Sequence, residues 1–287
     1  MLEEASAKLV EELGDELKGY VERINEALVN EALKYRGSSF YKPLLYALEK
    51  GKRLRPLILL LAFEAVGGKG ENPLPAAVAV ELLHTESLIH DDIIDGEVNR
   101  RGRLAFYLKW GYNAAILSAD FMLGMVLRIV STYRDSRVAD ELAEAVMRMC
   151  EGELLELLLI GENKPISMDT YINVAALKTA SLFKASTKIG AIIGGGNEGE
   201  VEALSRYGYA LGLAYQARDD ALDIDRKEEE LVGLLASSIG GREALTLLRK
   251  IALSYSESAK KALVSLNDYK AKSYLIKMAD LAVERSM

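Results

Sequence analysis

Apolar residues recur at spacings of three and four along nearly the whole chain, and this pattern sets the fold class. Such a spacing is typical of helices that each bury one face. Nothing in the sequence alternates convincingly with the period of two that marks a half-buried strand. The sequence therefore predicts an all-α fold, a single bundle of about ten helices. The pattern is interrupted by short segments that contain Gly or Pro, at residues 36–43, 67–75, 161–169, 194–199 and 239–243.

The 287 residues are predicted to form one domain. Half of them are hydrophobic, which suffices for one large core, and no stretch has the composition of a linker. One long amphipathic helix is expected over residues 9–35. Helices are also expected over residues 74–95 and 205–223, and both have few polar positions on any face. Helices of that kind are surrounded by other helices.

Charge and composition exclude several classes of function. The formal net charge is -7 and no basic run of five or more residues occurs, which argues against a nucleic-acid partner. The single cysteine, Cys150, excludes an internal disulfide and suits a reducing compartment. The chain starts with an acidic amphipathic segment unlike a signal peptide. Longer apolar runs such as residues 54–68 are shorter than the roughly 18–20 residues of a membrane span. We expect a cytoplasmic protein without stable membrane insertion.

Each of the two enclosed helices ends in a cluster of aspartates. The first helix reads "LLHTESLIHDDIIDG" over 82–96, and the second reads "YQARDDALDID" over 215–225. The first and last aspartates of each cluster lie on one helix face, with Cβ atoms roughly 6 Å apart. Both clusters have the form D-D-x-x-D, made by Asp91, Asp92 and Asp95 in the first helix and by Asp219, Asp220 and Asp223 in the second.

Carboxylates this close need solvent or a cation between them. Two unneutralised carboxylates at that distance repel by about 3 kcal/mol at an effective dielectric near 20, and by less than about 1 kcal/mol in water. Carboxylate oxygens suit Mg²⁺, which usually binds one or two protein carboxylates together with substrate phosphates. The only histidines, His84 and His90, do not form a zinc pattern. The clusters therefore indicate a Mg²⁺ site, and the alternative is two solvated helix ends.

Cationic side chains that could bind phosphate occur near the acids. In "GKRLRP", Lys52, Arg53 and Arg55 stand where a helix begins, and the free backbone N–H groups of a helix start favour an anion. Pro56 is at a position typical of a first turn. The alternative is a solvated basic turn.

Two arginines, Arg100 and Arg101 in "NRRGR", follow the first acidic cluster, and their guanidinium groups could clamp phosphate oxygens. Their alternative is an ion pair with the same aspartates. Lys178 lies in an otherwise apolar helix, where it binds a ligand or extends to solvent. His84 lies two helical turns before Asp91, so it either donates to a diphosphate or is an ordinary core histidine.

In this order, the segments "GKRLRP", "LLHTESLIHDDIID", "RRG", "AILSADFML", "LKTASLF" and "YQARDDALD" resemble those of the trans-isoprenyl diphosphate synthases, the polyprenyl synthetase family, from about residue 45 to 225. The resemblance implies an isoprenoid synthase fold over residues 1–287 around a central cavity, and a homodimer. It also implies a prenyltransferase that condenses an allylic diphosphate with isopentenyl diphosphate. The product would be a linear trans-prenyl diphosphate of farnesyl or geranylgeranyl length or longer.

The resemblance also assigns residues by position. It implies that Asp91 and Asp95 bind Mg²⁺ at the allylic diphosphate and that Asp219 holds another ion from the opposite wall. Asp92, Asp220 and Asp223 would belong to the shell around these ions. The isopentenyl diphosphate site would contain Lys52, Arg55, His84 and Arg101. The allylic site would contain Arg100, Lys178, Thr179 and Gln216. The catalytic residues would be Asp91, Asp95, Arg100, Lys178 and Asp219.

These side chains suit an ionisation mechanism without a Ser or Cys nucleophile. Metal ions and cationic groups would stabilise the departing diphosphate. The isopentenyl double bond would then attack the allylic carbocation, which apolar walls shield from water. A proton would then be lost to the released diphosphate.

Three departures from the family pattern leave alternatives open. The Gly-Lys-rich loop that usually follows the second acidic motif is absent, and Arg226 and Lys227 in its place are interpreted as a solvated helix start. In the family's R-R-G-x-P-x-x-H segment, Leu104 replaces Pro and Tyr107 replaces His. Glu86 stands at the position that normally helps to set product length. It either faces the product tunnel, where ionisation would cost several kcal/mol or the group would be protonated, or it is a surface or ion-paired group.

The main alternative is a catalytically impaired family member that acts as a regulatory subunit of a heteromeric synthase. A further alternative is a terpene cyclase or a head-to-head condensing enzyme on the same fold. Two intact D-D-x-x-D motifs favour the prenyltransferase over both.

Overall fold

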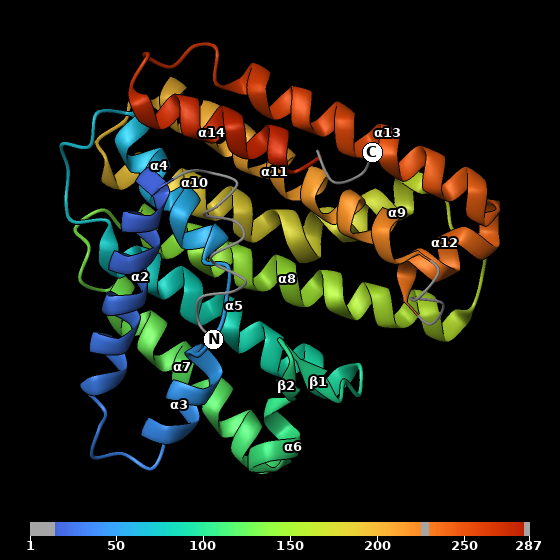
Figure 1. Cartoon of the computed structure of the whole chain (residues 1–287), viewed down its shortest axis with the longest axis horizontal. Helices are drawn as coiled ribbons and strands as arrows, with labels where there is room; N and C mark the ends of the chain where they lie inside the picture. Colours follow the sequence, from blue (N-terminus) through green and yellow to red (C-terminus); the bar gives the residue numbers. More distant parts are fainter. Residues whose placement is uncertain (1–14, 225–229, 284–287) are drawn as a thin grey trace. The chain divides into compact units, whose positions relative to one another are not determined.

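The computed structural model describes residues 15–224 and 230–283, and these residues are almost entirely helical (Figure 1). The predicted all-α fold is confirmed. The chain divides into two compact units, residues 1–60 with 71–139 (unit 1) and residues 61–70 with 140–287 (unit 2). The prediction of a single bundle around a central cavity stays a prediction, and each unit is described by itself.

Unit 1 is built around one apolar helix, α5. This helix is buried on most sides because α2, α3, α6 and α7 all pack against it, as its lack of a polar face predicted. In Figure 1, α5 and α7 lie side by side. The elements of unit 1 are α2 (Asp15–Leu33), α3 (Tyr41–Leu48), the first half of α4 (Leu54–Ala65), α5 (Leu74–Ile94), β1 (Asn99–Arg100), β2 (Arg103–Leu104), α6 (Phe106–Trp110) and α7 (Tyr112–Val130).

Unit 2 is organised around α11, which packs against α9, α10 and α13. Asn197 and Glu200 form a capping box at its start, each side chain binding the other's backbone N–H. The elements are α8 (Arg137–Glu162, in unit 2 from residue 140), α9 (Met168–Ala175), the π-helical turn η1 (Ala176–Ala180), α10 (Ser181–Ile193), α11 (Glu198–Asp223), α12 (Leu231–Ile239), α13 (Gly241–Ala262) and α14 (Lys270–Leu281).

Two glycines allow α11 to approach its neighbours closely. A Cβ atom on Gly208 would lie 2.5 Å from the carbonyl oxygen of Phe183, and one on Gly212 would lie 2.7 Å from the Cα of Ala180. Backbone atoms cannot yield to such a contact, so larger residues here would push α10 and η1 away from α11. Because the glycines are four residues apart, they lie on one face of α11.

Several elements depart from the predicted ones. Within residues 15–224 and 230–283 the chain already forms somewhat more helices than the ten or so predicted. The hairpin of β1 and β2 was not predicted. Helices α7 and α8 are separated at residues 131–136, a segment without Gly or Pro. Helix α3 begins inside the predicted break at 36–43, and of the helix predicted over 9–35, residues 9–14 lie outside the described residues.

Helix α7 also departs from the expectation that apolar runs are shorter than a membrane span. It has 19 residues and contains an 18-residue window with a mean hydropathy of 1.6, so by length and composition alone it could cross a membrane, although 44% of that window is buried inside the protein. Helices α12 and α13 meet the same criterion only if counted as one span bent by 118°. Core helices of soluble proteins also meet it, so the observation is weak support for membrane insertion.

Candidate active site

The first acidic motif lies at the C-terminal end of α5. Asp91 and Asp92 are in the last turn, and the backbone N–H of Asp95 donates to the carbonyl of Asp91 over 2.8 Å. Gly96 follows with a φ of 66°, a left-handed conformation that ends the helix. The helical geometry therefore places Asp91 and Asp95 on one face, as the sequence predicted.

Asp92 does not share that face but is buried and paired with Arg100. The Arg100 Nε donates to Asp92 Oδ1 over 2.6 Å. Burial raises the pKa of Asp92, and the bond from Arg100 opposes that shift. The alternative that the sequence left open for Arg100, an ion pair with these aspartates, is thus present in this structure.

The "GKRLRP" segment leads into α4 as predicted. Helix α4 begins at Leu54, so Arg55 and Pro56 are in its first turn, and Lys52 is exposed just before it. The Arg55 Nη1 lies 3.1 Å from His84 Nε2 of α5. Burial and then the charge of Arg55 lower the pKa of His84, so the imidazole is neutral at neutral pH. The structure brings together these two residues of the predicted isopentenyl diphosphate site.

Arg101 occupies the turn of the β1–β2 hairpin. Arg101 and Gly102 both have positive φ values, 55° and 73°. The Arg101 guanidinium donates to the carbonyl of Lys50, and Lys50 Nζ donates to the carbonyl of Arg101 over 3.3 Å. The hairpin turn is thereby fastened to the loop before α4, which contains Lys52.

The two substitutions in the arginine segment have local partners. The carbonyl of Leu104 accepts a hydrogen bond of 2.7 Å from the hydroxyl of Tyr46. Tyr107 is buried in α6 and packs against the ring of Tyr112, with centroids 4.8 Å apart. Tyr107 therefore serves the packing of α6, whereas the Leu104 side chain is 50% exposed and only its backbone carbonyl is engaged.

Glu86 is largely buried on α5. Its side chain is only 12% exposed, and Oε1 lies 3.2 Å from the Nδ1 of His90. Burial, followed by the charges of Asp91 and Asp120, raises the pKa of Glu86 to about 7. Burial also lowers the pKa of His90, so the contact is not an ion pair at neutral pH. The surface position that the sequence left open for Glu86 is wrong.

The second acidic motif is at the C-terminal end of α11. Gln216 and Asp220 continue the face that carries the two glycines. Thr179 of η1 donates to Gln216 Oε1 over 2.7 Å, and Gln216 Nε2 donates to Asp220 Oδ2 over 3.0 Å. Tyr171 of α9 donates to the same oxygen of Asp220. Two of the predicted allylic-site residues, Thr179 and Gln216, therefore meet.

Asp219 faces a different direction from Asp220. Its side chain is 45% exposed and accepts a 3.0 Å hydrogen bond from the Nε of Arg218. Arg218 stacks over the ring of Tyr215 at 4.5 Å. Asp223 follows Asp219 by one turn and is half-buried. Asp219 and Asp223 thus form the second i, i+4 pair of carboxylates.

Lys178 projects from η1 and is held by two glutamates of α8. Its Nζ lies 2.6 Å from Glu153 and 2.8 Å from Glu156. Burial alone would lower the pKa of Lys178, but the two carboxylates outweigh it and raise the pKa above its ordinary range. The alternative that this lysine extends to solvent is wrong in this structure.

Gly152 makes this contact possible, and sequence reasoning missed it together with the two glutamates. A Cβ on Gly152 would lie 2.6 Å from the backbone nitrogen of Lys178. The available signal was a glycine in the middle of a long helix, followed by glutamates at positions +1 and +4 on neighbouring faces.

The carboxylate pairs fit a metal that arrives with a phosphate better than one held by protein alone. Within residues 15–224 and 230–283, no group of three His, Cys, Asp or Glu side chains could hold an ion. Each motif instead offers two carboxylates on one helix face, Asp91 with Asp95 and Asp219 with Asp223. Mg²⁺ usually takes one or two such ligands and completes its shell with water and substrate phosphate.

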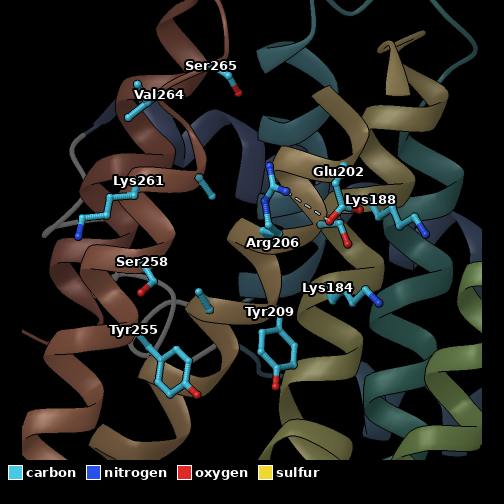
Figure 2. Close-up of a pocket in the computed structure, with 13 residues that line it drawn as sticks. Lys184, Lys188, Glu202, Arg206, Tyr209, Tyr255, Ser258, Lys261, Val264 and Ser265 are labelled. Atoms are coloured by element: carbon cyan, nitrogen blue, oxygen red, sulfur yellow. Dashed lines mark ion pairs between the residues drawn. The ribbon is translucent and has the colours of Figure 1, made fainter. Parts of the chain in front are cut away.

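The larger of two hollows in the described residues is not lined by the acidic motifs, and the smaller one borders the first motif. A groove of about 860 Å³ in unit 2 runs between α10, α11 and α13 and contains none of the predicted site residues. Figure 2 shows Lys261 extending to one side of this groove and Lys184 and Lys188 to the other. The cations do not converge there, so we do not place the active site in it. A pocket of about 30 Å³ in unit 1 is lined by Asp92, Arg100 and Arg101 among others.

Comparisons with known proteins find similar sequences and structures over most of this chain. Residues 38–266 match the model of the family described as polyprenyl synthetase. A geranylgeranyl diphosphate synthase of Methanosarcina mazei is 33% identical in an alignment 318 positions long, which covers 95% of this chain and 98% of that protein. The crystal structure of a decaprenyl diphosphate synthase from Rhodobacter capsulatus is similar with a TM-score of 0.85 and 28% identity, covering 96% of this chain and 98% of the other.

A second solved structure is informative about ligands. It is a polyprenyl synthase from Caulobacter crescentus, complexed with calcium and isoprenyl diphosphate. Its TM-score is 0.83 and its identity 28%, over 97% of this chain and 98% of that one.

Proposed function

This chain belongs to the polyprenyl synthetase family, and from that premise we propose that it condenses an allylic diphosphate with isopentenyl diphosphate. The product is a linear trans-prenyl diphosphate, of farnesyl or geranylgeranyl length or longer. Named relatives include synthases of geranylgeranyl, geranylfarnesyl and decaprenyl diphosphates, so the product length of this chain is open to measurement.

One observation carries this proposal. Helix α5 holds His84 against Arg55 and, two turns later, presents Asp91 and Asp95 on one face. A reaction between two diphosphates needs both a cationic site for one of them and carboxylates that hold a metal for the other. A cyclase with one diphosphate substrate has no use for the first site, which favours the condensing enzyme.

Mg²⁺ is the proposed metal. Asp91 and Asp95 of the first motif would hold one Mg²⁺, and Asp219 of the second motif would hold another. When bound, Mg²⁺ supplies a Lewis acid that stabilises the departing diphosphate. Asp92 and Asp220 are already engaged by Arg100 and Tyr171, which supports their place, with Asp223, in the surrounding shell. The calcium in the Caulobacter crescentus relative is also a hard, oxygen-seeking cation.

The remaining side chains bind and orient the substrates. Lys52, Arg55, His84 and Arg101 are proposed to bind isopentenyl diphosphate, and Arg100 and Lys178 to bind the allylic diphosphate. Gln216 and Thr179 hydrogen-bond each other and so present fixed neutral dipoles, which stabilise positive charge on the allylic group without reacting with it.

Assembly and location are part of the proposal. We propose a cytoplasmic homodimer without a nucleic-acid partner. Helix α8 supports an interface because Met147, Leu154 and Leu158 are 67%, 59% and 56% exposed and share one face. The single cysteine, Cys150, is exposed and has no second cysteine in this sequence with which to form a disulfide, which suits a reducing compartment.

The test is turnover by the purified protein with Mg²⁺, isopentenyl diphosphate and each primer from dimethylallyl to geranylgeranyl diphosphate. We expect longer products in mass spectra, and a loss of activity on chelation. Asp91→Ala should lower kcat/KM at least about 100-fold, the size of effect known for lost charge stabilisation in active sites. Asp140→Ala, an exposed acid in the first turn of α8, is the control and should retain activity.

Absence of turnover with every primer would contradict the proposal. If activity then appeared only after mixing with a second, complete synthase, the chain would be a regulatory subunit. No feature of residues 15–224 and 230–283 favours that alternative. The segment that stands in place of the Gly-Lys-rich loop includes residues 225–229, which lie outside the described residues.

A further inference from the structure

Arg53 and Glu81 form an ion pair inside unit 1. The Arg53 Nη1 donates to Glu81 Oε1 over 2.6 Å, and both side chains are only 2% exposed. The Arg53 Nε donates to Asn25 of α2 over 2.9 Å, and Nη2 donates to the carbonyl of Leu48. Neither charged group can reach a bound substrate, because both are enclosed by protein.

The loop before α4, which contacts the Arg53–Glu81 pair, has an unusual backbone conformation. Lys50 and Arg53 have φ values of 88° and 54°, a left-handed conformation that side chains other than glycine seldom adopt. Such a conformation persists only where surrounding contacts enforce it. The loop holds Lys52 and leads directly into the helix turn of Arg55.

At Gly51 the loop before α4 packs closely against the side chains of Arg53 and Glu81. A Cβ there would lie 2.7 Å from Arg53 Nη1 and 3.2 Å from Glu81 Oε1. It would also lie 2.9 Å from the Nη1 of Arg101, which belongs to the hairpin turn. The guanidinium groups of both basic segments therefore meet at one point, next to the carboxylate of Glu81.

We propose that Glu81 is a positioning residue for the isopentenyl diphosphate site, which fixes both the loop that carries Lys52 and Arg55 and the hairpin turn that carries Arg101. It does so by holding the guanidinium of Arg53 under Gly51, next to that of Arg101. Without it, two buried cations would face each other and the left-handed loop would relax. This inference rests on the proposed function for the identity of the ligand.

The test compares Glu81→Gln with the unaltered full-length protein in two measurements. Hydrogen exchange of residues 48–55 should become about tenfold faster or more, because opening of the loop would be less costly. The Kd for isopentenyl diphosphate, measured by calorimetry, should rise about tenfold. In turnover, the KM for isopentenyl diphosphate should rise by a similar factor, with less than about a threefold change in the KM for the allylic primer.

Gly51→Ala provides a second variant that removes no charge. Its methyl group displaces the two guanidinium groups, so it should give the same faster exchange and weaker binding even if Glu81→Gln does not fold. Gly37→Ala is the matched control, because a Cβ there has nothing within 4 Å. Glu49→Gln, which breaks the ion pair of Glu49 with Arg103 in the hairpin, should also leave the Kd unchanged.

The two hypotheses fail in different ways. Unchanged exchange and unchanged Kd in both Glu81→Gln and Gly51→Ala would overturn the positioning role. An equal rise in both KM values would also overturn it, since a general structural defect does not select one substrate. Tight isopentenyl diphosphate binding without any product would instead refute the proposed reaction and leave the role of Glu81 intact.

Discussion

The hydroxyl of Tyr171 donates a hydrogen bond to the carboxylate of Asp220, and both side chains are buried. Asp220 is on α11 and Tyr171 on α9, so the bond joins two of the helices on which the second acidic motif depends. The most buried aspartate of that motif therefore has a structural task that the half-exposed Asp219 does not share. We expect the two aspartates to respond differently to changes around them.

Tyr171→Phe should lower the free energy of unfolding by about 1–2 kcal/mol, because it removes one donor from a buried carboxylate. Urea unfolding followed by circular dichroism measures this change. Tyr112→Phe is the control: that tyrosine is 57% exposed, and its variant should differ from the parent by less than about 0.5 kcal/mol. Equal losses in the two variants would show that the bond to Asp220 contributes nothing.

Gly152→Ala should destabilise the protein by about 1–3 kcal/mol, because the new methyl group meets the backbone of Leu177 and Lys178. It should also lower kcat/KM by moving Lys178. The same substitution at Gly161, in the same helix but with nothing within 4 Å, should stabilise the protein by up to about 1 kcal/mol. Thermal unfolding of Gly152→Ala and Gly161→Ala measures both effects. A stabilised Gly152→Ala protein would refute the close contact of Gly152 with the backbone of Leu177 and Lys178.

Lys178→Met should cost about 1–3 kcal/mol of unfolding free energy, because Glu153 and Glu156 are then left side by side in a partly buried position. Adding Glu153→Gln to that variant should recover about half of the loss by removing one of the two charges. Activity should not recover, because the cation itself is missing. A double variant that regained turnover would remove Lys178 from the proposed allylic site.

Stability should depend on pH through Glu86. Its pKa of about 7 in the folded protein exceeds the pKa of a glutamate in the unfolded chain. At pH values between these two pKa values, the folded state therefore binds more protons than the unfolded state. The stabilisation it gives is complete below its unfolded pKa and is lost as pH rises through about 7. His90, whose pKa is lowered by burial, contributes in the opposite sense below its ordinary pKa.

Glu86→Gln removes this dependence. Relative to the parent, the variant should gain about 2 kcal/mol of unfolding free energy between about pH 5 and pH 8. The measurement requires protein freed of divalent ions, because a cation at Asp91 would lower the pKa of Glu86. A constant difference between the two proteins across this range would contradict the raised pKa.

The helices were predictable where the sequence carried a strong local signal. Residues 74–95 were predicted as an enclosed helix because their apolar residues leave no polar face. The observed helix α5 covers Leu74–Ile94. The end of α7 gave no such signal. There, Ser131 and Thr132 bond their hydroxyls to the carbonyls of Arg128 and Ile129, and many Ser and Thr residues inside helices make the same kind of bond.

The site was predictable to a smaller extent. The contact between Arg55 and His84 follows from two motifs recognised in the sequence, and so does the pairing of Arg100 with Asp92. The seat of Lys178 between Glu153 and Glu156 depends on how α8 packs against η1, and nothing in the local spacing of charges specifies that approach. The left-handed conformations of Lys50 and Arg53 could not be predicted from the sequence either, because these residue types normally avoid them.

The π-helical turn η1 contains one residue more than a regular α-helical turn between α9 and α10 would contain. The backbone N–H of Ser181 donates to the carbonyl of Ala176, five positions back, and the Ser181 hydroxyl takes the carbonyl of Leu177. Deleting one residue from 176–180 would leave a continuous helix but turn everything before it by about 100° about the axis. Tyr171 would then swing away from Asp220. In an alignment, a one-residue gap at this place would therefore separate relatives that share the geometry of the second motif from relatives that do not.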